Sequence, residues 1–571
     1  MAKAWASSLT EVEHEIKIHS FLYILVKSYW SHISSNGRSI PILPLGSSLI
    51  RIDETVSAVA IEIGKAASKI DTSEASFIIG NIYTSLLPKT TRARNGVFYT
   101  PPVLTKRLID LAGKSGVDWA TAKILDPASG SGAFLVPVCL KMCKALEGES
   151  AAIKIAHIEQ HLSGFEIDPF AAWLTQVFIE VALKDVLSKN LRIKKIVTVC
   201  DALEETSEHE NQKYDLIIGN PPYGKIKLSE SRRIRFRESL FGHVNYYGVF
   251  THMAVELTRK KGIIAFLTPT SFLSGEYFKN LRSYLRNNVS PLEIDFVSFR
   301  KGVFEDVQQE TMLAIYKKDT DHASVTEVNQ ITTLKDNELL ITELGRYIPA
   351  RDHLVPWILP RSLTQKKVVA SMMLMTNRLK DWGYKISTGP LVWNRHKDQL
   401  HNDPKPSSFP VVWAESVNGN GSFELKAEKK NHASYFHFNK GDDWLINNRP
   451  CILLQRTTSK EQAKRLIAAF LSEDFLKKKK GVVIENHLNM ILPCVDTPPI
   501  SFKVLTVFLN SALANESFRA ISGSVAVSAY ELESFPLPSV SQMESLKLLL
   551  EREHSESEIE HEILRIYSSY E

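Results

Sequence analysis

The chain has 571 residues, of which 44% are hydrophobic and 23% charged, so its composition is that of a globular protein and excludes a disordered one. A single hydrophobic core seldom organises so long a chain, and we therefore expect two or three domains. The net charge of +5 permits a polyanionic partner but does not require one.

The cysteines give little functional signal. They form no CxxC pair and show no paired spacing with histidine, which argues against a zinc ribbon or a disulfide framework and fits a reducing cytoplasm. No apolar run reaches membrane-spanning length, and the first residues lack a signal-peptide core. We therefore expect a cytoplasmic protein without a metal site or a membrane segment. The cysteines are Cys139, Cys143, Cys200, Cys451 and Cys494.

The first part of the chain has the spacing of helices. Phe21 and Leu25 recur at helical spacing among charges, and a second amphipathic stretch covers residues 54–70. We expect an N-terminal helical extension over residues 1–95. Residues 15–17 fit the E-x-K triplet of a nuclease active site, so a fused nuclease is one alternative for this extension. The triplet lies in a helical pattern and no aspartate precedes it, which favours a helical cap that packs on the next domain or clamps DNA.

Two segments that could contact a ligand follow the extension. The first is GVFYTPP, residues 96–102, where Thr100 precedes a double proline and is predicted to cap the next helix with a free hydroxyl. The second is DPASGSG, residues 126–132, between a short strand and a helix predicted from Ala133 onward. Strand, glycine turn and helix form the nucleotide-type arrangement, in which the missing Cβ atoms let the backbone approach a ligand.

Acidic residues end the next two predicted strands. The strand at 162–165 leads into Glu166, at the place where α/β folds accept hydrogen bonds from a ribose diol. The alternative role for an acid at this place is to cap the next helix, and Asp168, which follows, is suited to it. The strand at 196–199 is followed by Asp201, which could accept a hydrogen bond from an adenine amino group.

The segment DLIIGNPPY, residues 215–223, predicts a buried strand that ends at Asn220. Pro221 and Pro222 donate no backbone hydrogen bonds and fix their own φ, so the chain becomes rigid there. The Asn220 amide and the Pro221 carbonyl could then hold the two hydrogens of an exocyclic amine, while Tyr223 stacks on its ring. A proline-terminated strand in an unrelated protein is the alternative.

Taken together, five segments in fixed order resemble the gamma-class N6-adenine DNA methyltransferases of restriction-modification systems. The resemblance covers residues 96–318, and residues 302–304 are similar to the late motif whose aromatic side chain packs on the flipped base. It implies a doubly wound, Rossmann-like α/β sheet that binds S-adenosylmethionine and methylates adenine N6. The five segments are GVFYTPP, DPASGSG, GFEIDP, CDAL and NPPY.

The resemblance also implies residue roles. Glu166 would hold the cofactor ribose and Asp201 its adenine, while Tyr223 and Phe304 would sandwich the target base. Ala202 stands where some relatives place an aromatic residue over the cofactor adenine, and we assign no role to Val307. The implied cofactor-binding residues are Thr100, Asp126, Ala128, Gly130, Gly132, Glu166, Asp201 and Ala202. The implied catalytic residues are Asn220, Pro221, Pro222, Tyr223 and Phe304.

Basic residues follow the NPPY segment, and Glu230 is the only acid between Lys225 and Arg237. A base inside a duplex must be rotated out to reach such a site, and cations beside it are placed to grip phosphates. A solvated helix face is the alternative. The residues expected to contact phosphate here are Lys225, Lys227, Arg232 and Arg233.

Beyond residue 319 the pattern changes to short strands and turns. Residues 389–395, 413–423 and 451–456 are predicted as strands and hairpins, and 542–567 as a closing helix. This half resembles the α+β target-recognition domain of the same family, so we expect an extension at 1–95, a catalytic domain at 96–320 and a recognition domain at 321–571. The side chains suited to read bases are Arg395, Arg456, Thr457, Thr458, Asn486 and Asn489.

The implied partner is double-stranded DNA, and the chain itself is expected to be a monomer. A separate cognate restriction endonuclease and an orphan enzyme without one are the open alternatives. An N4-cytosine enzyme is an open alternative, since a close variant of NPPY serves that reaction, and an RNA or protein-glutamine methyltransferase is another. A cytosine C5 enzyme is rejected, because Cys451 lies on the wrong side of the predicted cofactor fold. A non-enzymatic DNA-binding protein would have no reason to keep an acid at each strand end.

Overall fold

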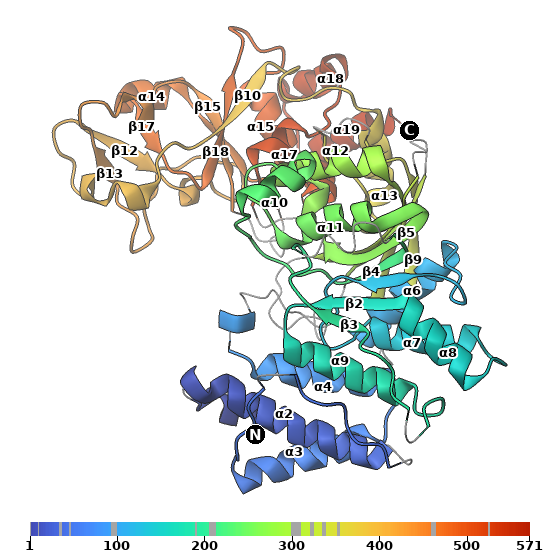
Figure 1. The fold of residues 1–571 in the computed structure, drawn as a ribbon. Helices are drawn as coiled ribbons and strands as arrows, with labels where there is room; N and C mark the ends of the chain where they lie inside the picture. The colour runs from blue at the N-terminus through green and yellow to red at the C-terminus, as the bar shows by residue number, and fades with distance from the viewer. Residues whose placement is uncertain are drawn as a thin grey trace. The chain divides into compact units, whose positions relative to one another are not determined.

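The computed structural model divides into two compact units, one of residues 1–270 with 280–348 and one of residues 271–279 with 349–571 (Figure 1). The predicted domain boundary at 320 differs from this division, because two strands beyond it continue the first unit's sheet. The residues that the structure describes are 2–9, 11–33, 37–44, 47–88, 90–92, 100–188, 191–204, 213–298, 310–319, 325–333, 338–350, 355–457, 464–522 and 526–570.

The first unit contains the N-terminal helices and a large mixed sheet. Its α-helices are α1 (Ala2–Ser7), α2 (Glu11–Ile33), α3 (Glu54–Ala67), α4 (Thr72–Leu86), α6 (Pro102–Lys114), α7 (Leu135–Ala145), α8 (Ala151–His161), α9 (Pro169–Ala182), α10 (Glu230–Arg235), α11 (Tyr246–Leu257) and α12 (Lys279–Asn288). Its strands are β1 (Ile124–Asp126), β2 (Leu162–Glu166), β3 (Val197–Val199), β4 (Tyr214–Gly219), β5 (Thr258–Pro269), β6 (Ser290–Val297), β7 (Thr311–Lys317), β8 (Thr326–Thr333) and β9 (Leu339–Tyr347).

The described strands of this unit form one nine-stranded sheet in the order β3-β2-β1-β4-β5-β7-β6-β8-β9. The five strands β3, β2, β1, β4 and β5 run parallel to one another. Strand β7 is antiparallel to both β5 and β6. The apolar run of β4 is buried throughout, as expected for a parallel strand covered on both faces. In Figure 1, α7 and α9 lie on one side of the sheet and α11 and α12 on the other. The predicted doubly wound α/β fold is therefore confirmed.

The order of the strands reverses at β1, which lies between β2 and β4. Ile124 of β1 stands opposite both Leu162 of β2 and Leu216 of β4. In open α/β sheets, ligands bind outside the carboxyl ends of the strands at such a reversal. The ends of β1 and β4 are therefore where a ligand site is expected.

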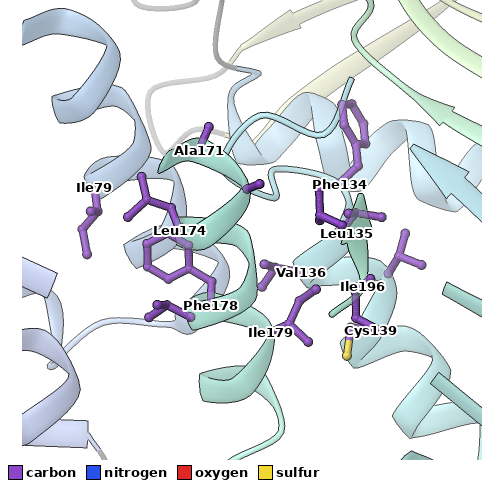
Figure 2. Packing of buried hydrophobic residues seen from close by; sticks show 14 of the residues in the cluster. Ile79, Phe134, Leu135, Val136, Cys139, Ala171, Leu174, Phe178, Ile179 and Ile196 are labelled. Carbon is purple, nitrogen blue, oxygen red and sulfur yellow. The ribbon is translucent and has the colours of Figure 1, made fainter. Parts of the chain in front are cut away.

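The N-terminal helices share a hydrophobic core with the helices that cover the sheet. Figure 2 shows Leu174 and Phe178 of α9 turned toward Ile79 of α4, while Ile179 of α9 lies near Val136 of α7. All five side chains are fully buried. The helix α9 thus connects the extension to the layer that packs on the sheet.

The second unit contains two smaller sheets and several helices. Its sheets have the strand orders β10-β18-β15-β16 and β11-β13-β12-β17-β14. Its strands are β10 (Tyr384–Thr388), β11 (Leu400–His401), β12 (Ser408–Val412), β13 (Tyr435–His437), β14 (Ile446–Asn447), β15 (Cys451–Gln455), β16 (Ala468–Leu471), β17 (Val482–Ile484) and β18 (Leu488–Pro493). Its α-helices are α13 (Gln365–Leu374), α14 (Glu473–Lys479), α15 (Phe502–Asn510), α16 (Ala512–Ile521), α17 (Ala529–Glu533), α18 (Val540–Leu550) and α19 (Glu556–Ser568).

Some local predictions for this half were wrong. Residues 389–395 form a single bridge at Leu391 and a 3-10 turn in place of a strand. Residues 413–423 contain no regular strand, but the antiparallel bridge between Val417 and Phe423 and the hydrogen bond from the Asn418 N–H to the Ser422 carbonyl at 2.9 Å close a short hairpin turn there. The closing helix is split into α18 and α19, because Ser555 forms its own capping box and starts a second helix. The strand predicted at 451–456 is confirmed as β15.

Short 3-10 helices connect several of these elements. They are η1 (Arg237–Ser239), η2 (Thr270–Leu273), η3 (Glu276–Phe278), η4 (Trp393–Arg395), η5 (Lys397–Gln399), η6 (Ala414–Ser416) and η7 (Asp443–Leu445). Within the described ranges, no helix combines the length and the apolar composition needed to span a membrane.

Candidate active site

Four of the predicted residues form a row along the carboxyl edge of the sheet. Asp126 ends β1, Glu166 ends β2, Asp201 follows β3 and Asn220 follows β4. Because the neighbouring strands run in the order β3-β2-β1-β4, the row reads Asp201, Glu166, Asp126, Asn220. Three strand spacings span about 15 Å, so an extended ligand lying across this edge would meet the four groups in turn.

Asp126 is the most deeply buried acid of the row, with 1% of its surface exposed. Its Oδ1 accepts a hydrogen bond from the Ala128 N–H at 3.1 Å, while Oδ2 has no hydrogen-bond partner among the described residues. Burial raises the pKa of this carboxyl to about 8, and the charge of Glu166 adds to the shift. A Cβ at Gly219 would lie 2.7 Å from Asp126 Oδ1, so the approach of the β4 end requires glycine.

The predicted glycine loop follows Asp126. Gly130 and Gly132 have φ of +54° and +89°, in the left-handed region that favours glycine. A Cβ at Gly132 would lie 3.0 Å from Thr175 Cγ2, whereas the space over Gly130 is open. Ser129 is buried, and its Oγ finds no hydrogen-bond partner in the described part of the chain. The loop therefore presents open backbone and an unsatisfied hydroxyl.

Glu166 ties the end of β2 to this loop. Its Oε2 accepts from the Gly130 N–H at 2.7 Å and its Oε1 from the Asp168 N–H at 2.9 Å. Burial raises the pKa of Glu166 to about 7. Asp168 caps α9, since its Oδ1 accepts from the Phe170 N–H at 2.8 Å. The capping role foreseen for Asp168 is thus confirmed, and the Glu166 carboxylate is held in place by two backbone donors.

Asp201 is bonded differently. Its Oδ1 accepts from the Leu203 N–H at 3.0 Å, and its Oδ2 accepts from the Arg232 guanidinium at 2.7 Å. Arg232 also pairs with Glu204 at 2.7 Å, and only 16% of its side chain is exposed. The adjacent Ala202 is buried. A residue predicted to contact phosphate is therefore engaged with the carboxylate predicted to contact the cofactor adenine.

The catalytic corner lies directly beyond β4. Asn220 and Pro222 are partly exposed, whereas Pro221 and Tyr223 are buried. The Tyr223 hydroxyl donates to the Leu267 carbonyl of β5 at 3.4 Å, and its ring meets Tyr247 edge to face at 6.2 Å between centroids. Burial raises the pKa of Tyr223 well above its usual value, so its hydroxyl stays protonated. Tyr223 is thus fixed beside Asn220 by contacts from β5 and α11.

The first predicted cofactor segment is described only from Thr100, which is buried with 2% exposed. The cap of α6 is Pro101 rather than Thr100, and no side chain bonds to the helix start, so the capping prediction was wrong. Proline already fixes the φ that the helix start needs. On α6, Arg107 donates to Asp295 of β6 at 2.7 Å and so anchors the helix to the sheet. Residues 96–99, Phe304 and Val307 lie outside the described residues.

The predicted DNA-contacting residues occur in both units. In the first, Lys225, Lys227 and Arg233 are exposed. In the second, Arg395 and Thr457 are exposed, while Arg456 is partly buried and donates to the Asn486 carbonyl at 3.1 Å. Thr458 is outside the described residues. In the described ranges, no group of three or more His, Cys, Asp or Glu side chains could hold a metal ion.

Sequence reasoning missed two features of this site. One is the unsatisfied Ser129 hydroxyl, which its position inside DPASGSG could have indicated. The other is Tyr83 of α4, whose hydroxyl donates to Asp168 Oδ2 at 2.6 Å. No local signal marks Tyr83, because the two residues are 85 positions apart.

Comparisons with known proteins agree with this geometry. Residues 74–342 match the family model described as N-6 DNA Methylase. The type II methyltransferase M.BsuBI of Bacillus subtilis is 25% identical over 455 residues, which cover 78% of this chain and 87% of that relative. The type II methyltransferase M.PstI of Providencia stuartii is 25% identical over 350 residues, or 59% of this chain and 68% of the relative.

Solved structures show the same fold. The structure of the type IIL restriction-modification enzyme MmeI in complex with DNA has a TM-score of 0.56 and 13% identity to this chain. The match covers 100% of this chain and 88% of that one. At this identity the likeness concerns the fold alone.

Proposed function

Since this chain is an N-6 DNA methylase similar to type II modification enzymes, we propose that it transfers a methyl group from S-adenosylmethionine to N6 of a flipped-out adenine at a specific site in duplex DNA. One observation carries the proposal. The row of Asp201, Glu166, Asp126 and Asn220 sets three acids beside the NPPY corner, at the strand reversal where open α/β sheets bind ligands.

The residues at this edge fit S-adenosylmethionine. The unsatisfied Oδ2 of Asp126 and the open space over Gly130 are what a bound polar ligand would fill. Glu166 would hold the ribose hydroxyls and Asp201 the adenine amino group, with Thr100, Ala128, Gly132 and Ala202 lining the same pocket. When bound, this cofactor supplies an electrophilic methyl carbon on a sulfonium.

The NPPY corner would prepare the target nitrogen. The Asn220 amide oxygen and the Pro221 carbonyl would accept the two N6 hydrogens and favour the tetrahedral nitrogen over the flat one, so they would act mainly in the transition state. Pro221 and Pro222 keep these acceptors rigid, so little reorganisation is needed. Tyr223 and Phe304 would hold the base between them. No metal is required, because placement and electrostatics do this work.

DNA binding would involve both units. Lys225, Lys227 and Arg233 of the first unit are exposed cations suited to phosphates. In the second unit, which we propose to be the target-recognition domain, the base-reading candidates are Arg395, Arg456 and Thr457. The chain would act as a monomer in the cytoplasm and would be paired with a separate restriction endonuclease.

Modification-sensitive sequencing of DNA from cells that express the protein tests the proposal. We expect N6-methyladenine at one recurring sequence, and none in cells that express Asn220→Ala at the same level. Methyl groups on RNA or protein, with the DNA unmodified, would overturn the assignment. Methylation of cytosine N4 at a recurring sequence would retain the fold and the cofactor but replace the substrate.

A further inference from the structure

The N-terminal helices contact the turn that carries Glu166. The hydroxyl of Tyr83, on α4, donates to Asp168 Oδ2 at 2.6 Å. The other oxygen of Asp168 caps α9 by accepting from the Phe170 N–H at 2.8 Å. Both oxygens of Asp168 are therefore engaged, and the side chain has one orientation. The Asp168 N–H in turn donates to Glu166 Oε1 at 2.9 Å. A continuous set of hydrogen bonds thus runs from α4 to Glu166.

The helix α2 supports the same hydroxyl. The ring of His19 stacks on Phe170 with centroids 4.2 Å apart, and its Nε2 lies 3.4 Å from the Tyr83 hydroxyl. Since the single hydroxyl proton of Tyr83 is donated to Asp168, Nε2 of His19 is the donor in that contact. Tyr83 is 3% exposed, so its hydroxyl is largely shielded from water although Asp168 is partly exposed, and a hydrogen bond to a carboxylate is stronger in such surroundings.

We propose that Tyr83 is a positioning residue for the cofactor ribose: it orients Asp168 and thereby holds the Glu166 carboxylate where the ribose hydroxyls bind. The inference rests on the proposed function. It gives the N-terminal helices a role in cofactor binding in addition to packing. Phenylalanine at position 83 would fill the same apolar space against Phe170, so packing alone does not account for a hydroxyl aimed at this turn.

The variant Tyr83→Phe isolates the hydroxyl. Binding of S-adenosylhomocysteine and of its 2′,3′-dideoxy analogue, which lacks both ribose hydroxyls, to the full-length protein would be measured by calorimetry. We expect the Kd of S-adenosylhomocysteine to rise about tenfold in the variant, equivalent to about 1.4 kcal/mol, because a hydrogen bond to a charged group is lost one step from the ribose. The Kd of the dideoxy analogue should change less than twofold, since that ligand lacks a hydroxyl for Glu166 to hold.

Ser28→Ala is the matched control. In the wild-type protein, the Ser28 Oγ donates to the Ile61 carbonyl at 2.8 Å. This bond joins α2 to α3 in the same helical bundle but lies away from residues 166–170. Both substitutions remove one largely buried hydroxyl, so both should lower the melting temperature slightly. Only Tyr83→Phe should change the ratio of the two Kd values. Asp168→Asn keeps the helix cap but weakens the acceptor for Tyr83, so it should reproduce the ribose-dependent loss.

The possible failures are distinguishable. A wild-type protein that binds neither ligand would overturn the proposed function, and this inference with it. A wild-type protein that binds S-adenosylhomocysteine, with a Tyr83→Phe variant that binds it equally well, would overturn the inference alone. An equal loss for both ligands would show that Tyr83 serves only to stabilise the fold. If Tyr83→Phe does not fold, the Kd values of the two ligands are measured on Asp168→Asn instead. A loss of affinity for S-adenosylhomocysteine alone supports the inference, and equal affinity to wild type overturns it.

Discussion

The polar groups near the strand ends of the first unit differ from those beside the base-reading candidates of the second. In the first unit, Asp126 and Ser129 are buried, and Oδ2 of Asp126 and Oγ of Ser129 find no hydrogen-bond partner among the residues that the structure describes. In the second, buried Glu485 accepts from the His487 N–H at 2.8 Å. Asn489 is also buried and donates to the Val527 carbonyl at 2.8 Å, so the prediction that its side chain reads bases is wrong. The first region keeps bonding capacity that a ligand would use. The second uses its buried polar groups to build a scaffold and leaves recognition to exposed side chains.

Removing the Asn220 amide should give the largest effect on the methylation rate and should leave cofactor binding nearly unchanged. We expect Asn220→Ala to lower kcat by about 100- to 1000-fold, because one of two acceptors for the developing tetrahedral nitrogen is lost. The Kd for S-adenosylmethionine should change less than threefold, since the acids lie on other strands. Single-turnover methylation of a duplex that carries the recognition sequence, together with calorimetry, measures both. A variant that methylates at near wild-type rate would exclude Asn220 from the reaction.

Asp126→Asn tests whether the unsatisfied carboxyl is kept for a ligand at a cost in stability. The pKa of Asp126 is about 8 in the folded chain against an ordinary 3.8, so between these values the folded chain holds a proton that the unfolded chain releases. Stability conferred by this group therefore falls as pH rises from about 4 to 8. Asparagine removes the titration, and we expect the ligand-free variant to be about 1–2 kcal/mol more stable at pH 8.

The same variant should bind S-adenosylmethionine at least tenfold more weakly, because one of the two acceptor oxygens of the carboxyl is replaced by an amide N–H₂ donor. Chemical denaturation at pH 5 and pH 8 gives the stability, and calorimetry gives the affinity. The difference in stability between the two proteins should be smaller at pH 5 than at pH 8, which serves as the internal control. A variant that is less stable at pH 8 and binds the cofactor normally would mean that Asp126 is a structural residue.

In the second unit, Arg395 and Arg456 should separate recognition from scaffold. Arg395 is exposed, so Arg395→Ala should reduce the preference for the cognate over a one-base-changed duplex by about tenfold and leave stability within about 0.5 kcal/mol. Arg456 donates to the Asn486 carbonyl, so Arg456→Ala should also cost about 1 kcal/mol of stability. Competition binding and thermal melts measure the two quantities. If Arg395→Ala and Arg456→Ala lost the same stability, the two arginines would not differ in their contribution to the scaffold.

The parts of the site that sequence could predict are those with a local signal. Asp126, Glu166 and Asn220 each directly follow a short apolar run, so their places at the strand ends could be inferred from neighbouring residues. The pairing of Arg232 with Asp201 could not, because it depends on how α10 folds back onto the end of β3. The bond from Tyr83 is likewise a product of tertiary packing.

The difference between local sequence signals and tertiary packing also explains where the predicted elements and boundaries differ from the observed fold. Strands β8 and β9 were assigned to the second domain, because their membership of the first sheet depends on the pairing of β8 with β6. At Gly389 a Cβ would lie 2.3 Å from the Glu485 carbonyl oxygen. The backbone there is fixed by a close approach from a distant segment, which the residues around it do not encode.

The smallest expected effects concern two neighbouring arginines of α10. Arg233 is exposed, whereas Arg232 pairs with Asp201 and Glu204, both at 2.7 Å. We expect Arg233→Ala to reduce the slope of log Kd for DNA against log salt by about 0.9, as for one lost phosphate contact. Arg232→Ala should leave that slope unchanged and weaken cofactor binding by about two- to fivefold, since Asp201 loses the cation that orients it. Salt titrations of DNA binding and cofactor calorimetry on both variants make each the control for the other. If Arg232→Ala instead reduces the salt slope, its side chain leaves Asp201 to contact phosphate in the complex, and the first unit's edge takes part in DNA binding as well as in chemistry.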